Sequence, residues 1–297
     1  MKWTKFNNVF LVGIGGIGMS ALAKYFLHMG KNVAGYDRTS TTMTTSLQEM
    51  GMEITFNQEV KSIPESYKKN NDCLIIYTPA IPKDHPQLTY FMNNNYEVHK
   101  RSVVLGMITS EHKTLAIAGT HGKTTTSTIL AHVLFQSEIG CNAFLGGISA
   151  NYNSNFLFHS ENAVTVVEAD EFDRSFLTLH PHLSAITSMD ADHLDIYSDK
   201  SDLGKTFAEF ASQTAKDGHV YLAEGLSLSG HETLSYGFGD DCFAIAMVKS
   251  QGEKQLLNFK IGQERISNIS FPMPGKHNAM NALVAHASGE RRRRPAL

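Results

Sequence analysis

Short apolar runs alternate with helix-like segments through the first third of the chain. The expected strands of this part are residues 8–12, 32–36, 72–77 and 96–99, and the expected helices are residues 19–29 and 86–94. Strands that alternate with helices pair side by side in parallel sheets. The pattern therefore predicts a Rossmann-like, doubly wound α/β domain, which we place at residues 1–109.

A second α/β pattern follows and then changes character. Its expected strands are residues 115–118, 163–167 and 183–187, and its expected helices are residues 127–135 and 202–215. From residue 242 to residue 271 the segments alternate around a turn signal at 250–253, which predicts antiparallel hairpins. We place this second domain at residues 110–287, after a connecting helix at 101–110.

Composition adds limits on function to this picture. The chain has 297 residues, 42% hydrophobic and 19% charged, with a formal net charge of −3. This net charge gives no broad positive potential that would favour binding to nucleic acid. No apolar run approaches the ~20 residues that a membrane span needs. No signal-peptide core follows Met1, so a cytoplasmic enzyme without membrane insertion is expected. No obligate protein partner is expected. The three cysteines are far apart in sequence, so we expect them to be packing residues rather than members of a disulfide or a zinc site.

A glycine turn in the second domain has the character of a phosphate-binding loop. Residues 119–126 read Gly-Thr-His-Gly-Lys-Thr-Thr-Thr, directly after the expected strand at 115–118 and before a helix-like stretch. Lys123 can reach β and γ phosphates, and the Thr124 hydroxyl can ligate magnesium. The spacing is shorter than the common G-x-x-x-x-G-K-[ST] pattern, which would need glycine at Ile117. We interpret this domain as a phosphate-loop ATPase domain, against the alternative of a plain glycine turn with an exposed lysine.

A second glycine turn follows the first expected strand of the chain. Residues 13–18 match the G-x-G-x-x-G pattern, and the strand at 32–36 ends beside Asp37, whose carboxylate can accept a ribose hydroxyl. This geometry suits a nucleotide diphosphate. The pattern alone leaves open a dinucleotide such as NAD or another phosphate ligand.

Two polar clusters follow strands of the second domain, at residues 168–173 and 190–195. Ligands of open α/β sheets bind at the carboxyl ends of the strands. A hard cation that bridges phosphates prefers carboxylate oxygen, and an imidazole can complete a second site, so Glu168, His193 and Thr124 form a sensible magnesium set. Acidic, solvated loops are the alternative for each cluster taken alone.

Two asparagines begin the last expected helix. Asn278 and Asn281 are three residues apart and share a helix face, where paired amides could hydrogen-bond an adenine edge. A helix cap with a nearby polar position is the plainer alternative.

Five motifs together resemble the Mur ligase family in content and order. They are GIGGIGMS at residues 13–20, AGTHGKTTT at 118–126, EADEFDRSF at 168–176, DADHLDIY at 190–197 and GKHNAMNA at 275–282. In this family the first turn holds the diphosphate of a UDP-sugar, so the resemblance favours a UDP-sugar over NAD.

The resemblance also implies roles for single residues. The implied ATP-binding residues are Gly119, Thr120, His121, Gly122, Lys123, Thr124, Thr125, Asn278 and Asn281, and the implied UDP-sugar-binding residues are Gly13, Gly15, Gly16, Ile17, Gly18, Asp37 and His121. Thr124, Glu168 and His193 would hold magnesium. Lys123, Glu168 and His193 would be catalytic.

The implied reaction uses ATP and Mg²⁺ to join L-alanine to UDP-N-acetylmuramate through an acyl phosphate, in peptidoglycan precursor synthesis. A tripeptide-adding recycling ligase of the same family is an alternative, although the residues of the motifs EADEFDRSF and DADHLDIY favour the alanine-adding enzyme. A nicotinamide-dependent oxidoreductase would leave the triphosphate loop unexplained.

The family pattern includes a third, C-terminal α/β domain, which this sequence does not show. Residues 288–297 instead form a basic tail with four consecutive arginines, expected to be disordered and solvated rather than a phosphate-binding arm. A chain that binds nucleotides but turns over poorly, or a binding-competent inactive fragment, is therefore a further expectation.

Overall fold

The computed structural model describes residues 3–69, 72–190, 200–251 and 254–290. These residues fall into two compact units. The first comprises the chain up to Glu111 together with Phe144–Glu161, and the second comprises His112–Ala143 and the chain from Asn162 onward.

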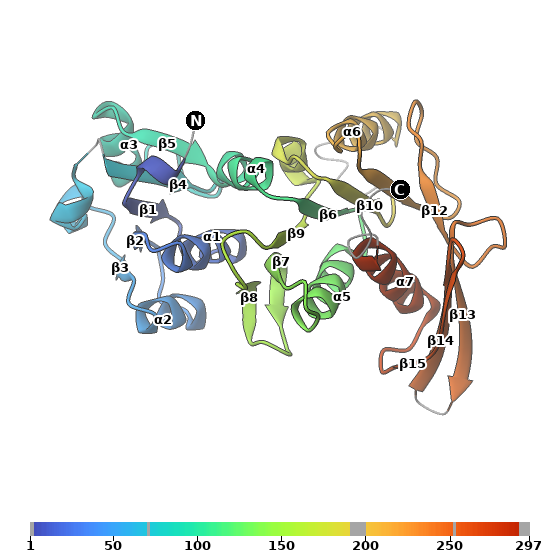
Figure 1. The fold of residues 1–297 in the computed structure, drawn as a ribbon. Helices are drawn as coiled ribbons and strands as arrows, with labels where there is room; N and C mark the ends of the chain where they lie inside the picture. Colours follow the sequence, from blue (N-terminus) through green and yellow to red (C-terminus); the bar gives the residue numbers. More distant parts are fainter. Residues whose placement is uncertain (1–2, 70–71, 191–199, 252–253, 291–297) are drawn as a thin grey trace. The chain divides into compact units, whose positions relative to one another are not determined.

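The first unit is built on a parallel sheet with strand order β3-β2-β1-β4-β5. Its strands are β1 (Asn8–Val12), β2 (Asn32–Tyr36), β3 (Glu53–Thr55), β4 (Cys73–Tyr77) and β5 (Glu97–Lys100). Its helices are α1 (Ile17–His28), α2 (Thr42–Glu49), α3 (Pro86–Asn93) and α4 (Arg101–Glu111), with short 3-10 helices η1 (Trp3–Lys5), η2 (Val60–Ser62) and η3 (Glu65–Tyr67). Helices α1 and α2 lie on one side of the sheet and α3 on the other (Figure 1). The predicted parallel α/β fold of this part of the chain is confirmed.

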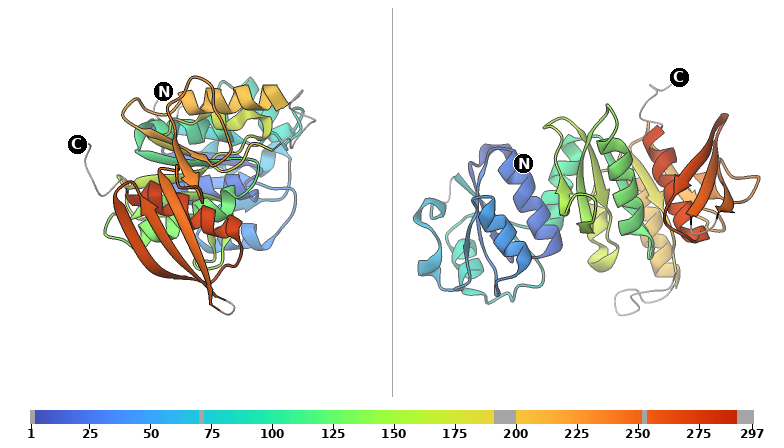
Figure 2. Two further views of the ribbon diagram at one scale, coloured as in Figure 1. Left: turned by 90° about the vertical axis from the view of Figure 1, so that its right-hand side faces the viewer. Right: turned by 90° about the horizontal axis from the view of Figure 1, so that it is seen from below.

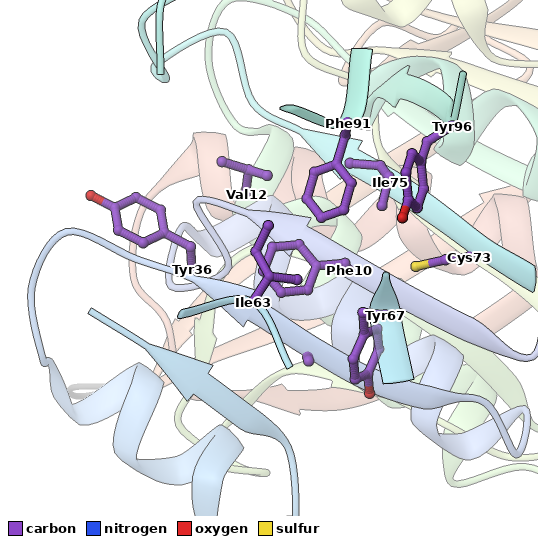
Figure 3. Close-up of a cluster of buried hydrophobic side chains, with 10 residues drawn as sticks. Phe10, Val12, Tyr36, Ile63, Tyr67, Cys73, Ile75, Phe91 and Tyr96 are labelled. Carbon is purple, nitrogen blue, oxygen red and sulfur yellow. The ribbon is translucent and has the colours of Figure 1, made fainter. Parts of the chain in front are cut away.

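The core beneath α3 explains the apolar run of β1. All five residues of β1 are buried, because helices cover both faces of the strand. Phe10 packs against the ring of Phe91 from α3, with ring centroids 5.2 Å apart, and edge-on against Tyr67 at 5.9 Å (Figure 3). Cys73 and Ile75 of β4 complete this cluster. The carboxyl end of β1 is thereby fixed, and the glycine turn at residues 13–18 starts from it.

The second sheet has ten strands in the order β15-β14-β13-β12-β11-β10-β6-β9-β7-β8. They are β6 (Thr114–Ala118), β7 (Cys141–Ser149), β8 (Ser154–Leu157), β9 (Val164–Glu168), β10 (Leu183–Ile186), β11 (His219–Ala223), β12 (Leu234–Gly237), β13 (Ala244–Gln251), β14 (Lys254–Ile261) and β15 (Glu264–Phe271). Pairing is parallel from β9 through β6 to β13 and antiparallel from β13 to β15. The parallel sheet followed by antiparallel hairpins is as predicted.

Helices of the second unit cover the parallel part of this sheet on both sides (Figures 1 and 2). They are α5 (Lys123–Phe135), α6 (Lys200–Ser212) and α7 (Lys276–Glu290), with a 3-10 helix η5 (Phe172–Thr178). Helices α5 and α7 pack against each other on one face, and α6 lies on the other (Figures 1 and 2). This arrangement brings the start of α7 near the start of α5.

Two further sequence expectations concern membranes and cysteines. None of the described helices is long and apolar enough to cross a membrane. The three cysteines are free thiols, and burial raises the pKa of Cys73 and of Cys141 to about 12. At that pKa both remain protonated near neutral pH, which fits a packing role.

Candidate functional site

The phosphate-type loop lies between the central strand β6 and helix α5. Strand β6 is flanked by β9 and β10, so the carboxyl ends of three parallel strands meet at this loop. Gly119 (φ +132°) and Gly122 (φ +83°) adopt backbone conformations that side chains disfavour. Helix α5 starts directly after Gly122, earlier than the predicted start at residue 127, because the left-handed Gly122 turns the chain straight into the helix. Lys123 and Thr124 thus occupy the first turn of α5.

Lys123 is held by a buried carboxylate that the sequence analysis did not single out. Its ammonium donates to both carboxylate oxygens of Glu171, at 2.7 and 3.0 Å, and to the Gly119 carbonyl at 2.7 Å. The Glu171 side chain is 0% exposed and that of Lys123 is 13% exposed. Glu171 belongs to the predicted acidic cluster at 168–173, but sequence spacing alone could not identify which carboxylate meets the lysine.

Thr124 and Glu168 come together as the magnesium hypothesis requires. The Thr124 hydroxyl donates to Glu168 Oε1 at 2.9 Å, and Ser127 Oγ lies 3.5 Å from Glu168 Oε2. A hydroxyl oxygen beside a carboxylate is a donor set that suits a hard cation. His193, the third predicted ligand, lies outside the described residues.

The remaining loop residues are tied to the segment after β10. The Thr120 hydroxyl lies 2.9 Å from Ser188 Oγ and accepts the Asp190 amide at 3.1 Å. The His121 amide donates to Ser188 Oγ at 2.7 Å. The His121 ring, 65% exposed, stands 3.8 Å from Asp190 Oδ2. Its predicted orientation toward a UDP-sugar stays a prediction, as does the role of Thr125.

The two predicted amides of α7 have different surroundings. Asn281 is nearly buried, and its Oδ1 lies 2.9 Å from the position that a Cβ on Gly122 would take. Asn278 donates to the Pro274 carbonyl at 2.7 Å, across the start of α7. Helix α7 begins at Lys276, two residues before the predicted start. Contact of either amide with adenine stays a prediction.

The glycine turn of the first unit connects β1 to α1. The amides of Gly13 and Ile14 donate to the Tyr36 carbonyl at 2.7 and 3.0 Å. Asp37 Oδ2 accepts the Gly15 amide at 2.8 Å, so in this structure the carboxylate is bonded to the turn itself. Whether Asp37, Gly16 and Ile17 contact a UDP-sugar stays a prediction.

Arg101 is a further residue at this turn, and the sequence analysis did not identify it. A Cβ on Gly18 would lie 2.8 Å from Arg101 Cδ and 2.8 Å from Arg101 Nη1. The absence of a side chain at Gly18 therefore lets the Arg101 side chain lie against the first turn of α1.

Comparisons with known protein families match both parts of the chain. The model for "Mur ligase family, catalytic domain" matches residues 8–113, and the model for "Mur ligase middle domain" matches residues 117–289. A UDP-N-acetylmuramate--L-alanine ligase of Christiangramia forsetii is 48% identical over 95% of this chain and 62% of its own length. One from Porphyromonas gingivalis is 51% identical over 95% of this chain and 63% of its own. This chain thus spans less than two thirds of the length of these relatives.

Solved structures show the same fold. The UDP-N-acetylmuramate-alanine ligase MurC of Thermotoga maritima superposes with a TM-score of 0.81 at 26% identity, over 97% of this chain and 65% of that one. The UDP-N-acetylmuramate:L-alanyl-gamma-D-glutamyl-meso-diaminopimelate ligase of Neisseria meningitides gives 0.82 at 20% identity, over 96% and 93%. The second likeness concerns the fold alone. On the strength of the two matched domain models and the site built at their strand ends, this chain belongs to the Mur ligase family.

Proposed function

We propose that this chain provides the nucleotide-binding parts of an ATP-dependent ligase that joins L-alanine to UDP-N-acetylmuramate. The observation that carries the proposal is the pairing of Lys123 and Thr124, on the first turn of α5, with carboxylates of one acidic segment. Relatives that bear this activity in their names, similar over 95% of this chain, support the choice of substrates.

The second unit would bind ATP. Backbone amides of the loop at residues 119–122 and of the first turn of α5 are suited to phosphate oxygens, because their N–H dipoles gather at the positive end of a helix. The Lys123 ammonium would offset negative charge on the transferring phosphoryl group. Thr124, Glu168 and His193 would hold Mg²⁺, which would offset negative charge on the phosphates.

The proposed chemistry has two steps. The muramoyl carboxylate attacks the γ-phosphorus of ATP, the bond to ADP breaks, and an acyl phosphate forms. The neutral amine of L-alanine then attacks the acyl carbon, the nitrogen loses a proton, and phosphate leaves as the amide forms. Most of the catalysis in such a phosphoryl transfer comes from positioning and charge stabilisation, which is the chemistry that Lys123 and its neighbours can supply.

The first unit would bind the UDP-sugar through the turn at residues 13–18. This turn follows the central strand β1 at the carboxyl edge of a parallel sheet, where open α/β folds bind nucleotides. Arg101, against Gly18, adds a cation beside the proposed diphosphate position.

The test is a ligation assay on the 297-residue chain. ATP, Mg²⁺ and UDP-N-acetylmuramate are incubated with L-alanine, with the tripeptide L-alanyl-γ-D-glutamyl-meso-diaminopimelate, or with neither, and phosphate release and the mass of the nucleotide sugar are measured. A mass gain of one alanyl residue that requires L-alanine supports the proposal. A gain only with the tripeptide supports the recycling reaction instead. Saturable binding of both nucleotides without turnover would reduce the proposal to nucleotide binding.

A further inference from the structure

The contact between Lys123 and Glu171 goes beyond the proposed phosphate-binding role of the lysine. In the phosphate-binding role proposed above, the lysine side chain would extend toward the phosphates. Here the ammonium is turned inward and contacts three oxygens: Glu171 Oε2 at 2.7 Å, Glu171 Oε1 at 3.0 Å and the Gly119 carbonyl at 2.7 Å. Two of the three contacts are with one buried carboxylate.

A count of hydrogen-bond donors shows that this arrangement leaves the Lys123 ammonium no spare donor for a phosphate. A lysine ammonium has three N–H donors and no acceptor. The three oxygens around Lys123 match these donors in number. The ammonium can therefore donate to a phosphate only by giving up, or sharing, one of the three contacts in this structure.

The segment that carries Glu171 is itself held in place. Arg174, with φ +58°, donates its amide to the Glu171 carbonyl at 3.0 Å. The Arg174 guanidinium donates to both carboxylate oxygens of Asp202 in α6, at 2.8 and 3.0 Å. The Asp170 carbonyl accepts the Phe176 amide at 3.1 Å. Because the backbone around Glu171 is fixed from several sides, its carboxylate has little freedom to follow a departing ammonium.

Burial makes the competition strong. The Glu171 side chain has no exposed surface, so bulk water does not reach it to replace a lost hydrogen bond. A carboxylate within hydrogen-bonding distance of the ammonium also repels the phosphates that the same ammonium attracts, and this repulsion is weakly screened in a buried site. Both effects act against nucleotide binding.

We propose that Glu171 is a positioning residue that competes with nucleotide phosphates for the Lys123 ammonium and thereby sets the affinity of the loop for ATP. This inference rests on the ATP-binding role proposed above. The carboxylate holds the lysine in the nucleotide-free chain and yields at least one donor when the triphosphate binds.

The test compares ATP dissociation constants of the wild-type chain and of Glu171→Gln by isothermal titration calorimetry with Mg²⁺. Glutamine keeps the size of the side chain but removes its charge and one of its two acceptors. The variant should bind ATP about ten-fold more tightly, equivalent to about 1.4 kcal/mol, because one charge-assisted hydrogen bond no longer opposes binding. A purely structural role of Glu171 predicts the opposite, since damage to the loop weakens binding.

Two further variants complete the design. Glu138→Gln makes the same change in net charge at an exposed position beyond α5 and should stay within about two-fold of wild type. Glu171→Asp keeps the charge but shortens the side chain, so its gain in affinity should be smaller than that of Glu171→Gln. Equal or weaker ATP binding by Glu171→Gln would overturn the inference, whereas absence of ATP binding in every protein would overturn the proposed function as well.

If Glu171→Gln does not fold, as judged by its circular dichroism, a crystal structure of the wild-type chain with a non-hydrolysable ATP analogue decides the matter. The inference requires that Lys123 Nζ has left at least one of its three oxygens and donates to a phosphate. An ammonium that still contacts all three oxygens, with the analogue bound, would refute it.

Discussion

Removing the Lys123 ammonium should destabilise the nucleotide-free second unit through the carboxylate that it leaves behind. In Lys123→Met the apolar part of the side chain is largely kept, but the fully buried Glu171 carboxylate loses two contacts, at 2.7 and 3.0 Å. Breaking one partner of a buried ion pair costs about 3–5 kcal/mol. Because Lys123 is 13% exposed, we expect a value near the lower end.

A cost of about 3 kcal/mol should be visible as a large shift in melting temperature. For a unit of this size each kcal/mol lowers Tm by about 2–4 °C, so the expected decrease is about 6–12 °C. The assay is thermal unfolding followed by far-UV circular dichroism without nucleotide. Trp3, the only tryptophan of the chain, is buried in the first unit, so its fluorescence reports on that unit separately.

The double variant Lys123→Met with Glu171→Gln separates lost pairing from lost packing. If the cost arises from a buried carboxylate that has lost its ammonium partner, the second substitution should restore at least half of the lost stability. Lys216→Met, at an exposed lysine of the second unit, is the matched control and should change stability by less than about 0.5 kcal/mol. The reasoning would be refuted if the Lys123→Met chain had the same melting temperature as wild type. It would also be refuted if the double variant were no more stable than the single variant.

Three other predictions concern separate parts of the chain. Gly119→Ala should abolish ATP binding in calorimetry, because φ is +132° and a Cβ would lie 2.8 Å from the Ser188 amide. Asn155→Ala should cost about 1–3 kcal/mol in urea unfolding, because the Asn155 amide oxygen, 2.8 Å from the buried Lys24 ammonium, is lost; an unchanged midpoint would contradict this. Burial lowers the pKa of His85, so on acidification the unfolded chain binds a proton at a higher pH than the folded chain does. The free energy of unfolding should therefore decrease below pH ~6.5, by at most about 1.4 kcal/mol per pH unit. His85→Asn should flatten the dependence of that free energy on pH between pH 5.5 and 7.5, and an equal slope in both proteins would count against this prediction.

The parts of the fold that sequence could predict are those with a strong local signal. Residues 9–12 are all apolar and are followed by a glycine turn, and with Asn8 they form β1 within the predicted bounds. Strand β6 begins at Thr114, one residue before the predicted strand at 115–118, and the phosphate-type loop follows it directly in sequence. Helix α2 had no comparable signal, because residues 39–46 are rich in serine and threonine, which favour turns and caps over helix interiors. Its start is set by Thr41 and Thr44, which cap each other.

Tertiary contacts determine the parts of the candidate sites that sequence patterns could not predict. Two carboxylates of residues 168–173 contact the start of α5: Glu168 binds Thr124 and Glu171 binds Lys123. Glu171 meets the lysine because the chain turns into the 3-10 helix η5 directly after it. Arg101 reaches the first glycine turn because β5 lies two strands from β1 in the sheet, although 83 residues separate it from Gly18. No pattern of local spacing contains either relation.

The central claim is that the chain carries two separate nucleotide sites, one in each unit. The most direct test is calorimetry of the wild-type chain with ATP, with UDP-N-acetylmuramate, and with each in the presence of the other, repeated for Gly13→Ala and Gly119→Ala. Gly13 has φ +90°, so a side chain there strains the first turn alone. The account predicts one site for each ligand, simultaneous occupancy, loss of only UDP-N-acetylmuramate binding in Gly13→Ala and loss of only ATP binding in Gly119→Ala. Displacement of one ligand by the other, or loss of both in a single variant, would contradict it.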